Sequence, residues 1–478
     1  MTKQKYITTA IPYVNDKPHI GHAIDYLLAD VWARYEKQQG SVVRYSAGTD
    51  EHGTKIAEKA SEKGIDPQEF VDGLYETFTD MQKKLNVSVT DFVRTSDPDH
   101  MRRVSEIWKK LDAADMIYKD KYSGWYCSGC EGFLTETEAK SVNYECLDHK
   151  KPLEKLEEVN YYLRVSKYTD EIREFAMNHV VPKWRGKEIL ELVKDGAQDV
   201  SISRPTEKLT WGVPVPGDDT QVMYVWVDAL SNYVTVLGYP DVDISDFWPA
   251  DVEVVGKDIL RFHAVIWPAM LLALGLELPE TLLAHGFVNA DGTKMSKSLG
   301  NVVDPILLID KYGTDAFRYF FLRHIPTYED GDYTDEKFIS AYNGELANDL
   351  GNLVARTANM VKRFVDGSTV VSSEFSYDLS ACDKYLADFR YDLALEEIWK
   401  LIQSLNKYID DKKPWEIAKD ESRKDELAET MSHLVAGLQL IGERLWPFLP
   451  DTAEKITKIF SGETIGDAPI LFPRIEKE

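Results

Sequence analysis

The sequence predicts an α/β protein in which an insertion interrupts a doubly wound parallel sheet and an all-helical C-terminal region follows. Strand-like and helix-like segments alternate over the first 65 residues and again after Pro205. Residues 115–205 break this alternation with short, polar, cysteine-bearing segments. From about residue 335 to 460 the apolar residues recur at helical spacing without a strand-like run, which indicates helices packed on one another.

The first predicted strand, Lys5–Ile11, leads through a polar loop into a helix with apolar residues at i, i+3, i+4 and i+7 spacing. A second strand over Val42–Ala47 precedes a helix at about Thr54–Lys63. After the insertion, the apolar runs predict further strands at Val222–Val227, Val252–Val255 and Leu282–Val288, and an apolar helix over 259–275. Because strands alternate with helices, we expect parallel pairing with helices on both faces.

Composition indicates a soluble globular protein. The 478 residues are 44% hydrophobic and 29% charged, which is enough apolar material for a large core. The net charge of −25 argues against a non-specific nucleic-acid binder, although a local basic path for one specific nucleic acid stays open. The longest apolar stretch, Ala264–Leu276, is too short to span a bilayer, and no signal peptide precedes the first strand. We therefore expect a cytoplasmic location.

Two motifs follow predicted strands, at the sheet edge where open α/β sheets bind ligands. Pro18-His-Ile-Gly-His22 places two imidazoles and a glycine at a helix N-terminus, which attracts anions. Lys294-Met-Ser-Lys-Ser298 places two lysines and two serines in a glycine-flanked loop, where they could bind a polyphosphate. Taken singly, the first motif could be surface histidines that cap a helix, and the second could be a solvated basic loop.

Together the two motifs identify a resemblance. They match the two signatures of the class I aminoacyl-tRNA synthetases, and the chain resembles the methionyl-tRNA synthetase family along essentially its whole length. The matching stretches between the signatures are Ala10–Tyr13, Asp50–Gly53, Tyr224–Ala229, Gly256–Ile259, Phe262-His263 and Trp267-Pro268. Leu230 departs from the pattern, since some members of the family have Pro there, which could alter pocket mobility but not the choice of amino acid.

The resemblance implies a Rossmann-like catalytic domain split by a connective insertion. We expect the first half of this domain at 1–114, the insertion with a zinc knuckle at 115–205, and the second half at 206–285. The KMSKS loop and stem-contact region would follow at 286–345. The helical anticodon-binding domain would then occupy 346–478.

The resemblance also implies the site residues. The catalytic residues would be His19, His22, Lys294 and Lys297. These four would bind ATP, which Mg²⁺ accompanies, together with Gly21, Gly256, Asp258 and Ser296. Methionine would be enclosed by Ile11, Tyr13, Asp50, Trp226, Ala229, Tyr233, Ile259 and His263. Asp50 would pair with the α-ammonium, and Tyr13 and His263 could donate weak hydrogen bonds to the sulfur. Aromatic walls suit a thioether, although these aromatics could also be ordinary core residues.

A paired cysteine spacing predicts a metal site. Cys127-x-x-Cys130 and Cys146-x-x-His149, fifteen residues apart, form a tetrahedral Cys₃His ligand set for zinc. The alternative is buried thiols without a metal. No open coordination position is implied, so the zinc should be structural, at one ion per chain, as in the single knuckle of this synthetase family.

One helix of the C-terminal region has an unusual polar face. Asn352, Arg356, Asn359 and Arg363 follow i, i+4, i+7 and i+11 spacing, and no acidic residue lies between positions 350 and 365. A solvated face is the plain interpretation. However, this stretch and Lys413-Pro-Trp415 look like the anticodon-reading stretches of methionyl-tRNA synthetases. By that resemblance, Asn352 and Arg356 would hydrogen-bond to bases and Trp415 would stack on one.

The resemblance implies that the chain is a methionine–tRNA ligase. It would join ATP and L-methionine into methionyl-adenylate and transfer the methionyl group to the 3′ end of tRNA(Met), for initiation and elongation. One alternative is a cysteinyl-type synthetase or amino-acid ligase, which would place zinc in the active site. Another is a zinc-bearing RNA-binding paralogue without catalysis, which should have lost a signature. We expect a monomer that has no membrane partner.

The cysteine pattern predicts about one zinc ion per chain. Elemental analysis of freshly purified protein tests this, and protein without zinc would contradict the assignment. Cys130→Ser should destabilise the insertion before the rest of the chain, because a structural zinc contributes directly to local folding.

Overall fold

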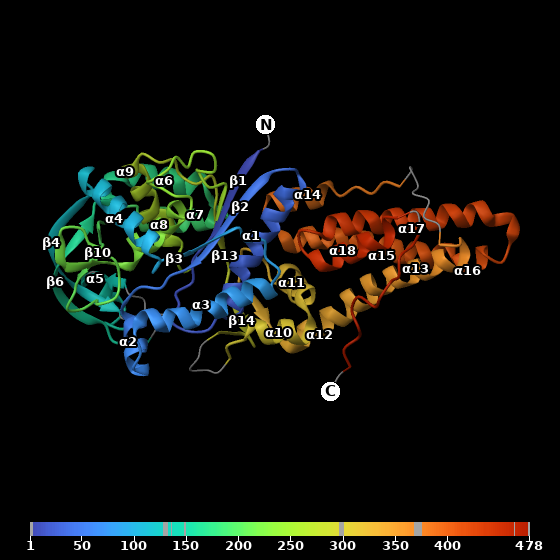
Figure 1. Cartoon of the computed structure of the whole chain (residues 1–478), viewed down its shortest axis with the longest axis horizontal. Helices are drawn as coiled ribbons and strands as arrows, with labels where there is room; N and C mark the ends of the chain where they lie inside the picture. Colours follow the sequence, from blue (N-terminus) through green and yellow to red (C-terminus); the bar gives the residue numbers. More distant parts are fainter. Residues whose placement is uncertain are drawn as a thin grey trace.

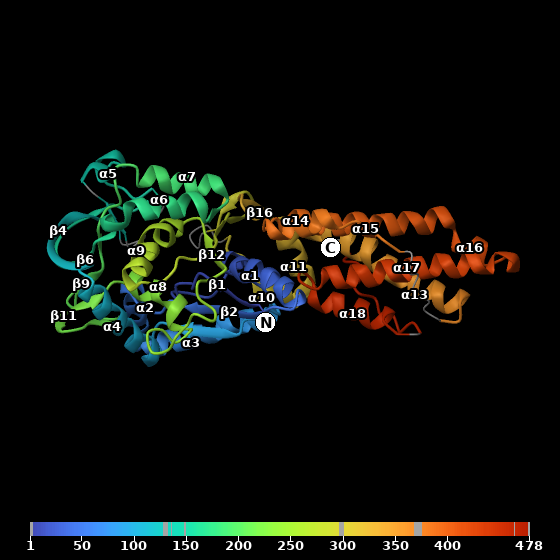
Figure 2. The same cartoon turned by 90° about the horizontal axis from the view of Figure 1, so that it is seen from above.

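The computed structural model describes residues 3–127, 132–134, 136–147, 150–295, 301–367, 375–462 and 464–476. The molecule is elongated, with the insertion at one end and the helical C-terminal region at the other (Figure 1). Figure 2, turned by 90°, shows the same order, with the parallel sheet between them. Among the helices in these described ranges, none is long and apolar enough to cross a membrane.

Six parallel strands form the central sheet, in the order β3-β2-β1-β12-β13-β7. Their bounds are β1 Gln4–Thr9, β2 Val42–Thr49, β3 Asp91–Arg94, β7 Val180–Val181, β12 Val252–Gly256 and β13 Leu282–His285. The chain crosses from β1–β3 on one side to β12–β13 on the other, so the strand order reverses next to β1. The predicted parallel sheet is confirmed, and the short edge strand β7, contributed by the expected insertion, was not predicted.

Helices cover both faces of this sheet. Side chains of β1 alternate between the two faces of the sheet. On one face Ile7 packs with α1 (Ile20–Gln38) and α3 (Pro67–Lys84). On the other face Tyr6 packs with four helices: α4 (Pro98–Ala113), α6 (Thr169–Asn178), α8 (Val225–Thr235) and α9 (Trp267–Leu274). Helix α2 (Thr54–Lys63) packs in a small separate cluster with α3. The layering is that of a doubly wound fold.

The segment between β3 and β12 contains two small antiparallel sheets. One has the order β5-β4-β6-β8, from Gly132–Leu134, Ile117–Cys127, Glu154–Leu163 and Val200–Ser201. The other has the order β10-β11-β9, from Pro214–Val215, Asp218–Met223 and Ser203–Pro205. Shorter helices accompany them: α5 Glu136–Ser141, the 3₁₀ turn Val165–Tyr168 and α7 Lys183–Leu192. Antiparallel hairpins explain why the strand–helix alternation of the sequence stops here.

A third small sheet follows β13 and supports Lys294. Its order is β15-β14-β16, from Thr293–Lys294, Val288–Ala290 and Gly331–Tyr333. The chain bends at Gly286, where a Cβ atom would lie 2.1 Å from the backbone oxygen of Glu329. Only glycine permits this close approach, and the predicted strand Leu282–Val288 therefore divides into β13 and β14.

The C-terminal region is helical, as predicted. Its helices are α10 Pro305–Tyr312, α11 Thr314–Arg323, α12 Asp335–Ala341, the π-helix Tyr342–Gly351, α13 Asn352–Phe364, α14 Ser380–Ala387, α15 Tyr391–Lys412, α16 Pro414–Ile417, the 3₁₀ turn Glu421–Arg423, α17 Lys424–Leu445 and α18 Pro450–Phe460. Their buried apolar residues form one continuous core with α1 and α3. The two parts of the chain thus share a core.

Two sequence predictions differ from the structure. The predicted strand Val222–Val227 is wrong in its second half, because β11 ends at Met223 and α8 begins at Val225. The run of valines is apolar because the helix is buried nearly all round, and such a run does not distinguish a buried helix from a strand. The predicted helix over 259–275 contains a π-helical turn, Phe262–Ile266, before α9.

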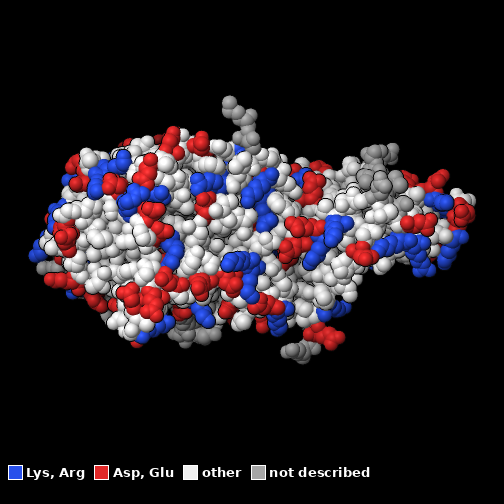
Figure 3. Space-filling model, in the orientation of Figure 1, with Lys and Arg blue, Asp and Glu red and all other residues white. Residues whose placement is uncertain are grey.

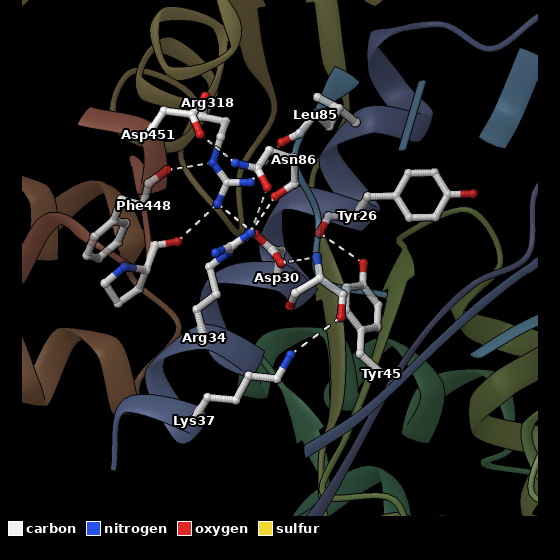
Figure 4. Close-up of polar contacts among 12 residues, drawn as sticks. Tyr26, Asp30, Arg34, Lys37, Tyr45, Leu85, Asn86, Arg318, Phe448 and Asp451 are labelled. Atoms are coloured by element: carbon white, nitrogen blue, oxygen red, sulfur yellow. Dashed lines mark hydrogen bonds and ion pairs between the residues drawn. The ribbon is translucent and has the colours of Figure 1, made fainter. Parts of the chain in front are cut away.

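A buried ionic cluster joins the layer of the central sheet to the helical region (Figure 4). Asp30 of α1 accepts hydrogen bonds or ion pairs from Arg34 Nε at 2.8 Å, Arg318 Nη2 at 2.8 Å and the Ser88 backbone N–H at 2.6 Å. Burial by itself would raise the pKa of the Asp30 carboxyl, but the two guanidinium groups hold it below its ordinary value. The carboxylate is therefore ionised and fully paired.

Arg318 of α11 extends this cluster to the chain between α17 and α18. It is fully buried and donates to the backbone oxygens of Phe448 at 2.6 Å, Pro447 at 3.0 Å and Leu85 at 3.1 Å. Together with the Asp30 contact, four of its five N–H donors therefore have partners. The guanidinium holds α1, α11 and the α17–α18 connection in one arrangement.

We predict that Arg318→Met lowers the free energy of unfolding by about 3–5 kcal/mol, because it leaves Asp30 and three carbonyls short of donors. Urea unfolding followed by circular dichroism measures this. Arg318→Met combined with Asp30→Leu should recover part of the loss, since no buried carboxylate is then left. Arg102→Gln is the control, because Arg102 forms an ion pair with Asp241 at the surface. If Arg318→Met lowers the free energy of unfolding no more than Arg102→Gln does, the cluster does not hold the helices together.

Candidate active site

A cavity of about 370 Å³ lies at the carboxyl ends of the central strands, where the strand order reverses. Its wall includes all eight residues of the expected methionine pocket: Ile11, Tyr13, Asp50, Trp226, Ala229, Tyr233, Ile259 and His263. It also includes six residues expected at ATP: His19, Gly21, His22, Gly256, Asp258 and Lys294. Segments more than 280 residues apart in the sequence therefore meet at one cavity. Ser296 and Lys297 lie outside the described residues.

His19 and His22 are fixed by the start of α1. His19 is the N-cap, and its Nδ1 accepts the N–H of Gly21 at 3.1 Å. Nδ1 of His22 accepts the N–H of His19 at 3.2 Å, and the two rings stack with centroids 3.8 Å apart. Because both Nδ1 atoms accept, the hydrogen of each neutral imidazole is on Nε2. Both rings thus present Nε2–H donors at a helix N-terminus, where the backbone dipole favours an anion.

Gly21 is required by this cap. A Cβ atom at position 21 would lie 2.8 Å from Cε1 and 2.9 Å from Nδ1 of His19. Any larger residue would therefore displace the capping imidazole from the cavity wall.

The segment that follows β2 fixes Asp50 beside Tyr13. The Asp50 N–H donates to the Pro12 oxygen at 2.9 Å, and the Val14 N–H donates to the Asp50 oxygen at 2.9 Å, which makes a parallel bridge. The next residue, Glu51, is fully buried and accepts two hydrogen bonds from Arg94, each at 2.8 Å. Asp50 therefore lies on a backbone segment that is held from both sides.

The apolar part of the cavity comes from α8 and from the π-helical turn before α9. The Trp226 ring stacks on Phe262 with centroids 3.7 Å apart. His263 Nδ1 lies 3.0 Å from the Ile259 oxygen, and its Nε2 lies 2.7 Å from the Tyr233 hydroxyl. Since a carbonyl can only accept, Nδ1 carries the hydrogen and Tyr233 donates to Nε2. Burial lowers the pKa of His263 to about 4, so this imidazole is neutral at physiological pH.

Trp226, Ala229 and Tyr233, which we expected in the methionine pocket, all lie on helix α8, although Trp226 falls within the predicted strand Val222–Val227. Trp226, Ala229 and Tyr233 follow i, i+3 and i+7 spacing, and this spacing brings all three to one helix face. Both nitrogens of His263 already have partners, so the structure does not support the expected hydrogen bond from this ring to a thioether.

The other end of the cavity is polar. A Cβ atom at Gly256 would lie 2.7 Å from an Asp258 carboxylate oxygen, so the glycine leaves room for that side chain. The Lys294 ammonium lies 4.7 Å from the centroid of the Phe287 ring, within range of a cation–π contact. Lys294 is thus placed over the wall of the cavity by β15.

This polar end also contains a buried histidine–carboxylate pair that was not predicted from the sequence. His285, at the end of β13, has its Nε2 2.6 Å from an oxygen of Asp25 on α1, and its Nδ1 lies 2.8 Å from the Gly286 oxygen. Burial alone would lower the pKa of His285, but the Asp25 carboxyl outweighs it and raises that pKa. Two features of the sequence could have indicated this pair. Asp25 lies three residues after His22 on the same helix, and His285 lies within a predicted strand that follows the sheet to the cavity.

Comparisons with known proteins agree with this geometry. A family model described as tRNA synthetases class I (M) matches residues 5–159 and 141–358. The methionine–tRNA ligase of Caldanaerobacter subterraneus subsp. tengcongensis is 42% identical over 513 aligned residues, which span 100% of this chain and 80% of that protein. The chain belongs to the methionine–tRNA ligase family. The Clostridium perfringens member is also 42% identical, over 100% of this chain and 79% of its own length.

The family likeness extends to the whole fold. The chain is similar to Mycobacterium tuberculosis methionyl-tRNA synthetase in complex with methionyl-adenylate, with a TM-score of 0.92 and 38% identity. The match covers 99% of this chain and 100% of that one. The free form of the same mycobacterial protein gives a TM-score of 0.85 at 34% identity.

Two of the four expected zinc ligands, Cys130 and His149, lie outside the described residues. Cys127 ends β4 and Cys146 follows α5, and both are buried in one small cluster with Ala139 and Leu153. Among the described residues, no group of three or more potential ligands gathers around a metal position. The thiols of Cys127 and Cys146 nevertheless lie in the same small cluster, and thiol ligands suit zinc.

The expected anticodon residues lie at the far end of the helical region. Asn352 and Arg356 are on α13, and Trp415, which is 40% exposed, is on α16 at the tip of the molecule (Figure 1). Arg356 Nη2 pairs with Asp410 of α15 at 3.0 Å. Basic side chains also appear near this tip on the face drawn in Figure 3, in a chain of net charge −25. The opposite face of α13 is buried, as its pattern predicted.

The depressed pKa of His263 predicts a pH-dependent stability. Between about pH 6.5 and pH 4 the unfolded chain binds a proton that the folded protein excludes, so the free energy of unfolding should fall as the pH falls through this window. At ~1.4 kcal/mol per pKa unit, the shift of the His263 pKa contributes roughly 3 kcal/mol to the free energy of unfolding, and this contribution is lost between pH 7 and pH 4. In His263→Gln the free energy of unfolding should therefore fall by about 3 kcal/mol less over this pH range than in the parent protein, as measured by urea unfolding. Equal losses would contradict the assignment of a buried, neutral imidazole.

Proposed function

We propose that the chain activates L-methionine with ATP and transfers the methionyl group to the 3′-terminal adenosine of tRNA(Met), for initiation and elongation of translation. The observation that carries the proposal is one cavity lined by His19, Gly21 and His22 of the first signature, by Lys294 and Met295 of the second, and by all eight expected methionine-pocket residues. Family membership supports it independently.

The first step needs no nucleophile from the protein. A carboxylate oxygen of methionine attacks the α-phosphorus of ATP, the bond from that phosphorus to the bridging oxygen breaks, and pyrophosphate leaves. In the second step a hydroxyl of the terminal adenosine attacks the methionyl carbonyl, and AMP leaves with the bonding electron pair. Catalysis then consists of positioning and of stabilising charge on phosphate oxygens.

His19, His22 and Lys294 are the residues to which we assign that stabilisation. The stacked imidazoles carry Nε2–H donors at the N-terminus of α1, and a helix N-terminus favours phosphate. Lys294 would meet the pyrophosphate from the opposite wall, with Lys297 and Ser296 as further expected contacts. We assign Gly21, Gly256 and Asp258 to the nucleotide, with Mg²⁺ bound to its phosphates.

Methionine would lie between Asp50 and the apolar wall. The Asp50 carboxylate suits the α-ammonium, and the Trp226 ring, held by its stacking on Phe262, offers polarizable surface for an unbranched thioether. Since His263 uses both nitrogens inside the protein, we expect it to contact the side chain by its ring carbons. The neutral ring also avoids placing a charge beside the thioether.

Zinc and tRNA complete the proposal. Cys127, Cys130, Cys146 and His149 would hold one structural zinc ion, which would fix the fold of the insertion and through it the path of the tRNA acceptor end. Asn352, Arg356 and Trp415 would read the anticodon. The expected monomeric state stays a prediction.

The test is ATP–pyrophosphate exchange with single amino acids. Methionine should support exchange and cysteine should not, and the two alternatives of the sequence analysis predict otherwise. Exchange with cysteine would indicate the cysteinyl-type ligase. Binding of tRNA without any exchange would indicate a non-catalytic RNA-binding paralogue.

Trp415→Ala should reduce charging of tRNA while leaving methionine-dependent exchange nearly intact. Trp415 lies at the tip of the helical region, and loss of one base–aromatic stack costs ~1–3 kcal/mol. Arg356→Gln should act in the same direction. Arg102→Gln is a matched control, because Arg102 is also an exposed arginine that pairs with an acidic residue, Asp241, but lies on α4 outside the helical region. Parallel loss of exchange and charging would mean that the helical region only supports the fold.

A further inference from the structure

The one acidic residue of α8, Asp228, lies behind the substrate cavity and does not line it. Its side chain is 1% exposed. One carboxylate oxygen lies 2.6 Å from Nδ1 of His52 and the other lies 2.9 Å from Nε2 of His100. Both histidines are buried as well. A buried carboxylate therefore bridges two imidazoles from different elements.

The hydrogen positions in this bridge follow from the chemistry of the groups. Burial alone would raise the pKa of the Asp228 carboxyl, but the two imidazoles lower it to about 2. An ionised carboxylate can only accept, so His52 Nδ1 and His100 Nε2 both donate to it. The other nitrogen of His100 lies 2.8 Å from the hydroxyl of Thr235, at the end of α8. The bridge thus fixes both rings in defined orientations.

The three residues connect the elements that form the methionine site. His52 is two residues after Asp50, on the segment that follows β2. Asp228 lies on α8 between Trp226 and Ala229, which line the cavity. His100, from the first turn of α4, supports the same carboxylate from behind. The Asp228–His52 contact is therefore a direct polar link between the Asp50 segment and α8.

We propose that Asp228 is a positioning residue for amino-acid recognition, which acts through His52 to set the distance between the Asp50 carboxylate and the apolar wall of α8. This inference rests on the proposed function, because it assumes that an amino acid binds between those two surfaces. It assigns no contact between Asp228 and the substrate. A rigid link is useful here because the ammonium and the side chain of one small ligand must meet two separate elements at once.

A pair of ligands distinguishes this role from general support of the fold. L-Methionine has both the ammonium and the thioether, whereas 4-(methylthio)butanoate lacks only the ammonium. In Asp228→Asn a neutral amide replaces the carboxylate, and its NH₂ group cannot accept. The N–H of His52 then either loses its acceptor or donates to an uncharged oxygen, so the link to the Asp50 segment is lost or weakened in either orientation of the amide. The Asp50 segment should then shift relative to α8, and methionine should lose affinity while the deamino analogue should not.

Isothermal titration of the full chain measures both affinities. We expect Asp228→Asn to weaken methionine binding by roughly 10–100-fold, the range for loss of a hydrogen bond to a charged group, and to change the analogue less than threefold. The KM for ATP in pyrophosphate exchange should stay close to the parent value. Equal weakening of both ligands, or no weakening of methionine, would overturn the proposal.

Two further variants keep the test decisive if Asp228→Asn folds poorly. His52→Leu removes the link to the Asp50 segment and should reproduce the selective loss, whereas His100→Leu leaves that link in place and should not change the ratio of the two affinities. Asp315→Asn is a control for loss of a buried carboxyl, because Asp315 accepts from the Thr452 N–H far from this cavity. A parent protein that binds no methionine would refute the proposed function. If the parent binds methionine normally, and both Asp228→Asn and His52→Leu keep the parent ratio of the affinities for methionine and for 4-(methylthio)butanoate, only this inference would be refuted.

Discussion

The ionic cluster around Asp30 determines how the two ends of the molecule are joined. Helix α1 carries His19 at its N-terminus and Asp30 in its middle, so the same rigid element reaches both the cavity and the helical region. Arg318 bonds to that carboxylate and to two carbonyls of the α17–α18 connection. A hydrophobic contact alone would permit sliding, whereas a buried guanidinium bonded to one carboxylate and three carbonyls fixes the relative positions of these elements. The N-terminus of α1, with His19 and His22, is thereby held in a fixed position relative to the helical region.

Much of the fold was predictable because its strongest signals are local. The strands β1, β2 and β12 and the helix α2 agree with their predicted ranges, since alternation and helical spacing express which face is buried. The valines at 225 and 227 misled the strand prediction because α8 is buried nearly all round, which removes its polar face. The edge strand β7 has only two residues and no periodicity to detect.

The site shows a similar division. Two short motifs with specific spacing predicted that His19, Gly21 and Lys294 belong to a ligand site. The family resemblance supplied the residues expected in the methionine pocket, and all of these residues line the cavity. The Asp25–His285 pair and the Asp228 bridge escaped notice, because each joins residues more than 120 positions apart and neither partner belongs to a short motif. Such pairs become visible only when the fold brings them together. They also adjoin or line the cavity, which is where local sequence rules are most often overridden.

The helical stretch from Asp335 to Phe364 has a mechanical consequence. Helix α12, the π-helix and α13 follow one another without a break, so they make a rod roughly 45 Å long at ~1.5 Å per residue. One end adjoins β16, which pairs with β14 and through it with the strand of Lys294. Asn352 and Arg356 lie on the distal half of the rod. A tilt of the rod about the small sheet would therefore be transmitted to Lys294 through β16 and β14.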